Sequence, residues 1–421
     1  MATIKLFNSS LNGKVTVCSS KSIAHRAIIA GVLSCKDITI FNVKSSKDIL
    51  ATIDSLKVLG ADITYDGSKV VIKKSNLIKN SSLEVNANES GSTLRFLIPV
   101  FVALNNETLF SGEGRLPVRP LDDYLTIFDK EGISYEKGED YLPLKTKGTF
   151  KGDAFFVKGN VSSQFITGLM LGAIVCDREI TINITTPLES RPYVDITKKV
   201  LEDFGHSVQI SDNIIRIKKG ETNISTYAVE NDWSQAAFFL AGGVMSGDVT
   251  LCDMNLNSYQ GDKKIVEILK KMGADIIEDK DTIRAKKSNL NGIKIDVSQI
   301  PDLVPILCVL GAFAKGETLI YNAGRLKIKE SDRILTSKKM LENAGVTTET
   351  GDDYIKIFGK GSFLSCVIDS FCDHRIVMAS AIMGTQTKNL FIKNYEAVEK
   401  SYPEFFSDYI KIGGKGEFIN E

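Results

Sequence analysis

The stretch SIAHRAIIAGVLSCKDITIFN, from Ser22 to Asn42, decides the fold because its pattern recurs along the whole chain. It begins with an apolar helix and ends in a short strand, and this order returns about every 70 residues. The later copies are STLRFLIPVFVALNNETLFSG (92–112), SSQFITGLMLGAIVCDREITIN (162–183), WSQAAFFLAGGVMSGDVTLCD (233–253), LVPILCVLGAFAKGETLIYN (303–322) and HRIVMASAIMGTQTKNLFIKN (374–394). A period kept over six copies predicts a repeat architecture.

A second shared element follows each of these stretches: a helix that ends at a glycine, then two short strands, as in IDSLKVLGADITYDGSKVVI (53–72). Each copy therefore reads βαβαββ. The first helix of a copy is apolar almost all round, which predicts an enclosed helix, whereas the second carries lysines and has one face in water. We expect the first copy to open with a strand over Lys14–Val17. The sixth copy lacks its hairpin, so we expect the strand at Thr3–Phe7 to complete it.

The repeat predicts an α/β protein of two domains with three βαβαββ copies each. The first domain covers residues 14–225, and the second is discontinuous, with residues 1–13 and 226–421. We expect the active site in the cleft between the two domains.

Composition excludes several classes of protein. Lys plus Arg and Asp plus Glu are both 52, so the net charge is zero, which argues against a general binder of nucleic acid or membrane surfaces. The seven cysteines form no C-x-x-C pair, which favours reduced thiols and a cytoplasmic location. The N-terminus does not resemble a signal peptide, and the longest apolar run is too short to span a bilayer.

Several first helices begin with cations, although the positive end of a helix dipole favours anions there. Lys21 and Arg26 lie at the first start, Arg95 follows the second, and Arg375 opens the sixth. Ser22 and Arg26 are four residues apart and share a face. Either these are solvated side chains beside serine N-caps, or an anionic ligand binds at the helix starts. Three basic starts at equivalent positions favour the ligand.

Further cations lie in loops. Arg119 stands in the stiff turn SGEGRLPVRP, Arg333 ends the charged run 325–333, and Lys400 precedes Ser-Tyr-Pro-Glu. The run is equally compatible with the solvated start of a helix, and Lys400 with a helix cap.

Two acids stand among these cations. Asp302 begins the apolar helix of the fifth copy, where it is either an N-cap or a residue that faces the ligand. Glu330 is flanked by Lys329 and Arg333, which should keep it ionised unless burial opposes them. One carboxylate as base and one as acid would suit proton transfer at a carbon centre.

No cofactor motif is present. The sequence has neither G-x-x-x-x-G-K-[ST] nor G-x-G-x-x-G after a strand, and it has no G-x-S-x-G. Its three histidines are too few and too dispersed for a metal site, so we expect His25 and His374 either to orient neighbouring groups or to be half-buried. We expect an enzyme without cofactor or metal that grips anions with Lys, Arg and helix N-termini.

The motifs KSIAHRAIIA, SGSTLRF, RPLDDY, VSSQFITGLML, ESRPYVDIT, IPDLVPIL, KIKESDRI, FCDHRIVMA and KSYPEFF resemble, in order, those of the 5-enolpyruvylshikimate-3-phosphate synthase family. The resemblance implies the enolpyruvyl transferase fold, two inside-out α/β barrel domains. It also implies transfer of the enolpyruvyl group of phosphoenolpyruvate to the 5-hydroxyl of shikimate 3-phosphate, through a tetrahedral intermediate, with release of phosphate.

The resemblance also assigns roles to residues. Asp302 is implied as the base for the 5-hydroxyl, and Glu330, together with Lys21, as the proton donor to the methylene carbon. The residues implied to bind phosphoenolpyruvate are Lys21, Gly91, Arg119, Gln164, Arg333, Arg375 and Lys400. Those implied to hold shikimate 3-phosphate are Lys21, Ser22, Arg26, Ser162, Ser163, Gln164, Ser190, Tyr193, Asp302 and Lys329.

Three positions depart from the family pattern: Glu89 replaces a frequent Asn, Phe96 a Pro, and Lys327 an Arg. The first two lie where tolerance to glyphosate is commonly decided, so the strength of inhibition stays open.

Two alternative functions remain. A sister enzyme that uses a UDP-amino sugar (UDP-N-acetylglucosamine) usually has a Cys in the loop matching 112–119, which this chain lacks. A non-enzymatic anion-binding scaffold would leave the two acids unexplained. We expect only small anionic partners, no nucleic acid or membrane, and a monomer.

Overall fold

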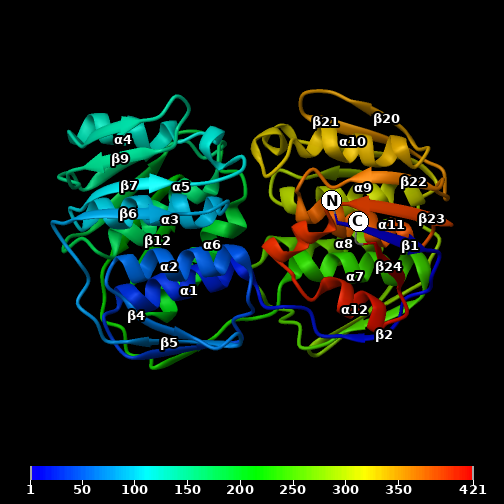
Figure 1. Cartoon of the computed structure of the whole chain (residues 1–421), viewed down its shortest axis with the longest axis horizontal. Helices are drawn as coiled ribbons and strands as arrows, with labels where there is room; N and C mark the ends of the chain where they lie inside the picture. The colour runs from blue at the N-terminus through cyan, green and yellow to red at the C-terminus, as the bar shows by residue number, and fades with distance from the viewer. Residues whose placement is uncertain (1, 420–421) are drawn as a thin grey trace. The chain divides into compact units, whose positions relative to one another are not determined.

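The computed structural model describes residues 2–419, which divide into two compact units (Figure 1). The first unit comprises residues 19–230, and the second combines residues 2–18 with residues 231–419. The boundaries predicted at residues 14 and 226 are each five residues early. Strand pairing explains the shift: β2 (Asn12–Val15) pairs with β15 (Asp248–Leu251) of the second unit, and β14 (Thr226–Ala228) pairs with β3 (Ile38–Phe41) of the first.

Three four-stranded sheets build the first unit. In sheet order they are β14-β3-β5-β4, with β5 at Lys69–Lys73 and β4 at Asp62–Tyr65; β6-β7-β9-β8, at Ser82–Asn86, Glu107–Ser111, Leu144–Lys147 and Ser134–Lys137; and β10-β11-β13-β12, at Ala154–Val157, Ile180–Ile184, Ile214–Lys218 and Ser207–Ser211.

The second unit has three sheets of the same size. They are β16-β17-β15-β2, with β16 at Asp275–Asp279 and β17 at Thr282–Lys286; β18-β19-β21-β20, at Lys294–Asp296, Gly316–Tyr321, Tyr354–Gly359 and Thr347–Thr350; and β22-β23-β1-β24, at Cys366–Asp369, Asn389–Lys393, Thr3–Phe7 and Lys415–Ile419.

All six sheets follow one plan, one parallel pair extended by antiparallel strands, so the predicted sixfold repeat is confirmed. β1 lies between β23 and β24, antiparallel to both, as expected for a strand that completes the sixth copy. Two details were wrong. The sixth copy does have a last strand, β24. The strand predicted at Lys14–Val17 is β2, which belongs to the fourth copy, while β14 supplies the missing strand of the first copy.

The helices fall into two kinds, as predicted. The first helix of each copy is buried nearly all round, and α7 and α11 are buried along their whole length. These helices are α1 (Lys21–Leu33), α3 (Gly91–Ala103), α5 (Ser163–Ala173), α7 (Trp233–Ser246), α9 (Val304–Phe313) and α11 (His374–Gly384). The second helices have an exposed face: α2 (Lys47–Val58), α4 (Asp122–Glu131), α6 (Arg191–Asp203), α8 (Ile265–Lys271), α10 (Arg333–Asn343) and α12 (Phe405–Lys411).

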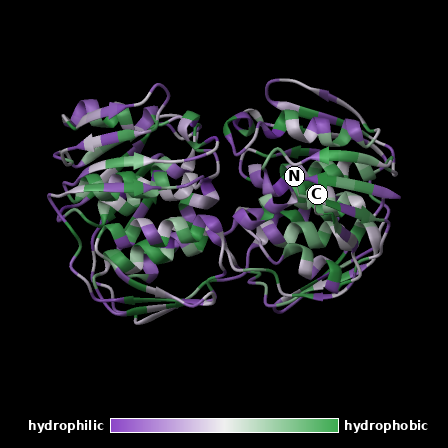
Figure 2. Cartoon of the chain, in the orientation of Figure 1, coloured by the Kyte–Doolittle hydropathy of each residue, from purple (hydrophilic) through white to green (hydrophobic). Residues whose placement is uncertain are grey.

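Within each unit the helices therefore lie inside and the sheets outside. Strands such as β3 and β5 alternate between buried and more exposed residues, so each has one face in water. Figure 2 shows apolar residues concentrated on the enclosed helices, strands of mixed hydropathy, and polar residues along the loops. Short 3-10 turns precede or replace helix starts: η1 (Leu116–Val118), η2 (Gly261–Lys264), η3 (Pro301–Leu303), η4 (Gly324–Ile328) and η5 (Tyr395–Lys400).

Two glycines let α5 pack closely on α3. A Cβ atom on Gly168 would lie 2.2 Å from the carbonyl oxygen of Arg95 and 2.2 Å from the hydroxyl of Tyr124, and one on Gly172 would lie 3.0 Å from Pro99. Gly168 and Gly172 are four residues apart and share a face. The close approach holds Gln164, in the first turn of α5, beside the start of α3.

We predict that Gly168→Ala lowers the free energy of unfolding by about 2 kcal/mol or more, because its methyl group meets backbone that cannot turn away. Urea unfolding measures the change. Gly31→Ala is the matched control, since its Cβ would meet chiefly the movable end of Ile72. Equal stability of the two variants would contradict this account of the α3–α5 contact.

Candidate active site

Lys21, the first residue of α1, has a carboxylate partner that sequence reasoning missed. Its Nζ lies 2.6 Å from Oδ2 of Asp48, in the first turn of α2. Asp48 is buried and stands where the α2 dipole favours an anion. The ion pair holds the ammonium at the start of α1 and joins the two helices.

Arg26 is buried with 2% of its surface exposed. Its Nε donates to Thr197, Nη1 to the carbonyl of Ser22, and Nη2 to Thr167 and to the carbonyl of Tyr193. These contacts use four of the five N–H groups of the guanidinium, so one is left for a ligand. Burial lowers the pKa of Arg26 to about 9, opposed by the Tyr193 phenol, and in the described chain no carboxylate contributes to that balance.

A second buried arginine, Arg95, orients Gln164. Nη1 of Arg95 donates to Oε1 of Gln164 at 2.9 Å, and Nε2 of Gln164 donates to the hydroxyl of Ser92 at 3.1 Å. The guanidinium of Arg95 lies 4.8 Å from the ring centre of Phe165. Arg95 was recognised in the sequence only as a cation near a helix start, and its role in fixing the Gln164 amide depends on contacts across 69 residues.

Gly91 is required by a close approach. A Cβ atom there would lie 2.5 Å from Nη1 of Arg119, so any larger residue would push the guanidinium away from the start of α3. Arg119 is itself buried, immediately after η1. Gly91 and Arg119, which the resemblance implies to bind phosphoenolpyruvate, thus lie against each other.

The serines occupy helix starts in the same unit. Ser162 is the N-cap of α5 and accepts a hydrogen bond from the amide of Gln164, and Ser163 opens that helix. Ser190 precedes α6 in the left-handed region, with φ of 53°, and is buried, while Tyr193 lies in the first turn. A non-glycine residue held at positive φ is uncommon and clusters at functional sites. Ser22, on α1, offers its carbonyl to Arg26.

In the second unit, Asp302 lies among three cations. Its carboxylate lies 2.7 Å from Nη1 of Arg333, 3.6 Å from Nζ of Lys329 and 3.4 Å from Nη2 of Arg375. Nη1 of Arg375 also donates to the carbonyl of Asp302. The N-cap interpretation of Asp302 is wrong, because the residue lies inside η3 and caps no helix.

Arg333 binds two further carboxylates. Nη2 lies 2.9 Å from Glu330, and Nε lies 2.8 Å from Asp373, the N-cap of α11. Burial alone would lower the pKa of Arg333, but Asp373, Glu330 and Asp302 together raise it above its usual range. Burial also raises the pKa of Asp373, yet Arg333 and His374 outweigh it and the net shift is downward. Arg333 is only 1% exposed, so the interpretation of its charged run as a solvated helix start is wrong at this residue.

The remaining predicted residues are also buried or partly buried. Lys400 is buried at the end of η5, five residues before α12, so it caps no helix. Burial lowers the pKa of Lys329, with Asp302 and Glu330 opposing. His25 and His374 are buried deep in their units, beyond the partial burial expected of them.

Sequence reasoning missed a buried acid, Asp262, in η2. Burial, and then the charge of Asp302, raise its pKa to about 7, while Arg375 and the hydroxyl of Ser234, which donates to it, lower it. Nothing in the spacing QGDKK indicates burial, so the sequence carried no signal for this group.

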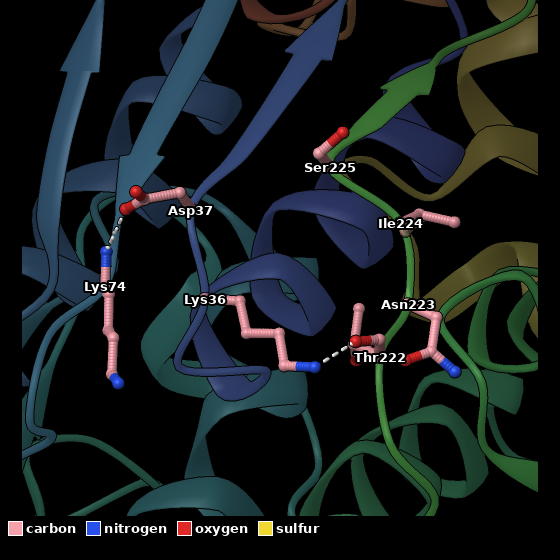
Figure 3. Close-up of a pocket in the computed structure, with 7 residues that line it drawn as sticks. All are labelled: Lys36, Asp37, Lys74, Thr222, Asn223, Ile224 and Ser225. Carbon is pink, nitrogen blue, oxygen red and sulfur yellow. Dashed lines mark hydrogen bonds between the residues drawn. The ribbon is translucent and has the colours of Figure 1, made fainter.

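A surface pocket of the first unit lies apart from these residues (Figure 3). Lys36 donates there to the carbonyl of Thr222, in the segment that leads into β14, and Asp37 accepts from the amide of Lys74. The residues that line it are Lys36, Asp37, Lys74, Thr222, Asn223, Ile224 and Ser225.

Within residues 2–419, no group of three His, Cys, Asp or Glu side chains is placed to hold a metal ion. Over the same residues, every helix is too short or too polar to cross a membrane.

Comparison with known proteins gives consistent results. The model of the EPSP synthase (3-phosphoshikimate 1-carboxyvinyltransferase) family matches residues 7–409. The chain is 44% identical to a 3-phosphoshikimate 1-carboxyvinyltransferase of Clostridium novyi over 98% of both chains, and 42% identical to that of Clostridium acetobutylicum, again over 98% of both.

Solved structures agree. An EPSP synthase of Acinetobacter baumannii covers 100% of both chains with a TM-score of 0.83 and 26% identity. The enolpyruvyl transferase NikO of Streptomyces tendae, at 15% identity, matches with a TM-score of 0.80 over 100% of this chain and 99% of its own. The latter supports the fold alone, which is the enolpyruvyl transferase fold expected from the motifs.

The raised pKa of Asp262 predicts a pH dependence of stability. The folded protein keeps this proton between the unfolded pKa of 3.8 and about 7, whereas the unfolded chain releases it, so Asp262 lowers the stability progressively as pH rises across that window. Asp262→Asn removes the effect, and its stability relative to the unmodified protein should increase from pH 5 to pH 7 and then level off. Urea unfolding at each pH measures this, with Asp54→Asn on the exposed face of α2 as control for the loss of a charge. A difference independent of pH would contradict the shift.

Proposed function

Because the chain belongs to the EPSP synthase (3-phosphoshikimate 1-carboxyvinyltransferase) family, we propose that the cations and carboxylates described above form the active site of this transferase. The reaction moves the carboxyvinyl group of phosphoenolpyruvate to the 5-hydroxyl of shikimate 3-phosphate and releases phosphate. Each unit holds only part of the required chemistry.

One observation carries the assignment of the acid and the base: a single buried guanidinium, Arg333, binds both Asp302 and Glu330. Two carboxylates are thereby fixed side by side with charges compensated, as proton transfer at two neighbouring atoms of the substrates requires. Lys329 and Arg375 complete the surroundings of Asp302.

We propose the following sequence of steps. Asp302 takes the proton of the 5-hydroxyl as the oxygen bonds to C2 of phosphoenolpyruvate, and protonated Glu330, with Lys21, supplies a proton to C3. In the tetrahedral intermediate, Glu330 then takes a proton back from C3, the bond from C2 to the phosphate oxygen breaks, and the vinyl group is restored. The proton held by Asp302 leaves with the phosphate.

The first unit supplies chiefly binding groups in this proposal. Arg26 and Arg119 are buried cations, and Lys21 is partly buried beside Asp48, so anionic substrates would offset the cost of burying them. Gly91 and the amides at the start of α3 suit the phosphate of phosphoenolpyruvate, because a helix N-terminus attracts anions. The serines at the α5 and α6 starts and Tyr193 suit shikimate 3-phosphate. Placing the two substrates and neutralising their charge should supply most of the rate.

We also propose that one chain is sufficient for activity, since all these groups come from a single chain, and that the protein works in the cytoplasm, where its seven free thiols stay reduced. Sedimentation in the presence of both substrates tests the first point, and a sedimenting dimer with residues shared between copies would contradict it.

Phosphate release from phosphoenolpyruvate tests the function, measured with shikimate 3-phosphate and with UDP-N-acetylglucosamine in separate assays. We expect release with shikimate 3-phosphate only. Release with the sugar nucleotide would favour the sister reaction, and release with neither acceptor, using folded protein, would favour an anion-binding scaffold.

Asp302→Asn should lower kcat about 10²- to 10⁴-fold, because it removes the base but keeps an acceptor for Arg333. Both substrates should still bind, as titration of each ligand into the variant can show. Asp352→Asn is the control, since that carboxylate is exposed and pairs with Lys327 in the same unit. An undiminished kcat in Asp302→Asn would assign the base elsewhere.

A further inference from the structure

Four fully buried polar residues form a continuous hydrogen-bonded chain across three helices of the first unit. Nδ1 of His25 in α1 lies 2.7 Å from the hydroxyl of Thr52 in α2, which lies 2.7 Å from that of Thr93 in α3. The Thr93 hydroxyl donates to Ser90 at 2.7 Å, and its amide donates to the same oxygen at 3.2 Å. We call these four residues the hydroxyl chain.

The hydroxyl chain ends at the start of α3, beside a residue implied to bind phosphoenolpyruvate. Ser90 is the N-cap of α3 and immediately precedes Gly91, against which Arg119 lies. One helical turn before His25 and Thr52, the same two helices are joined by the ion pair of Lys21 and Asp48. The hydroxyl chain starts on α1, which carries Lys21 but also Ser22 and Arg26, and it ends at the start of α3, beside Gly91. The serines at the α5 and α6 starts lie on elements that it does not touch.

The number of protons on each group sets which residue donates and which accepts along the hydroxyl chain. A hydroxyl has one proton, so Thr93, which donates to Ser90, accepts from Thr52, and Thr52 in turn accepts from His25. His25 must then carry its proton on Nδ1. Burial, with Lys21 and Arg26 adding to it and Asp48 opposing, lowers the pKa of His25 to about 3, so the ring is neutral. Its other nitrogen then has no proton to donate, which fits an Nε2 atom that has no hydrogen-bond partner in the described chain.

The alternative direction would have the Ser90 hydroxyl donate to Thr93, opposite to the bond observed, and would place the proton on Nε2. The His25 ring packs edge to face with Phe96, at 6.3 Å between centres. The Thr93–Ser90 bond thus sets one polarity for all three hydroxyls.

We propose that His25 is a positioning residue for phosphoenolpyruvate, which acts through Thr52 and Thr93 to hold Ser90 and the start of α3 in the geometry that Arg119 and the ligand require. The inference rests on the proposed function. It assigns no chemical step to His25, whose action reaches the substrate only through other residues.

Thr52→Val tests the proposal, because it keeps the volume of the side chain and removes the central hydroxyl. We expect the KM for phosphoenolpyruvate to rise about 5- to 10-fold, the factor that corresponds to one buried hydrogen bond, with the KM for shikimate 3-phosphate changed less than about 2-fold. Thr52→Ser, which restores the hydroxyl, should return the KM for phosphoenolpyruvate to near its original value. Thr108→Val is the matched control, since Thr108 is fully buried in β7 and its hydroxyl has no partner in the described chain.

Nitrogen NMR of the ring in ¹⁵N-histidine-labelled protein supplies a second readout that does not depend on the variants. His25 should show a protonated Nδ1 and an unprotonated Nε2, and Thr52→Val should change that ratio. A proton on Nε2 in the unmodified protein would overturn the proposal. So would equal KM values in Thr52→Val and Thr108→Val, or an equal rise for both substrates. If the unmodified protein releases no phosphate at all, the proposed function fails, and the NMR result still decides the polarity of the chain.

Discussion

Each unit encloses three apolar helices behind sheets, and a helix buried on all sides can present only its ends to a ligand. The starts of these helices have unsatisfied amides and partial positive charge. Adding Lys21, Arg95 or Arg375 near such starts concentrates positive charge where an ordinary helix would avoid it. The folded chain keeps these cations inside by binding them to carbonyls, hydroxyls and a few carboxylates.

The two units stabilise their buried arginines with different kinds of partner. In the first, Arg26 is held by two threonines and two backbone carbonyls, with the ring of Phe96 4.8 Å from its guanidinium. In the second, three carboxylates surround Arg333. Because its partners are neutral, the positive charge of Arg26 is available to anions. The surroundings of Arg333 are nearly neutral overall and contain carboxylates that can exchange protons. The type of partner given to each arginine therefore sets the net charge of its surroundings.

The sequence predicted the elements of this arrangement better than their connections. Enclosed helices, six sheets and the completion of the last sheet by Thr3–Phe7 follow from periodicity, because burial imposes a pattern on neighbouring residues. Asp48 and Asp373 were not recognised as partners, since each meets its cation across 27 or 40 residues and in a different helix. The exchange of β2 and β14 was missed for the same reason: a short strand of three or four residues fits two sheets equally well by pattern, and only tertiary pairing decides.

The two departures from the family pattern near the start of α3, Glu89 and Phe96, make different kinds of contact. Glu89 lies against Gly114, where a Cβ atom would be 2.4 Å from its carboxylate, so its charge is directed toward the loop that leads to Arg119. Phe96 is fully enclosed and touches two groups at once, the guanidinium of Arg26 through its face and the ring of His25 at right angles. A proline at this position could make neither contact. Phe96 thus joins Arg26, implied for shikimate 3-phosphate, to the hydroxyl chain proposed to hold the start of α3, so we expect a change at Phe96 to affect the binding of both substrates.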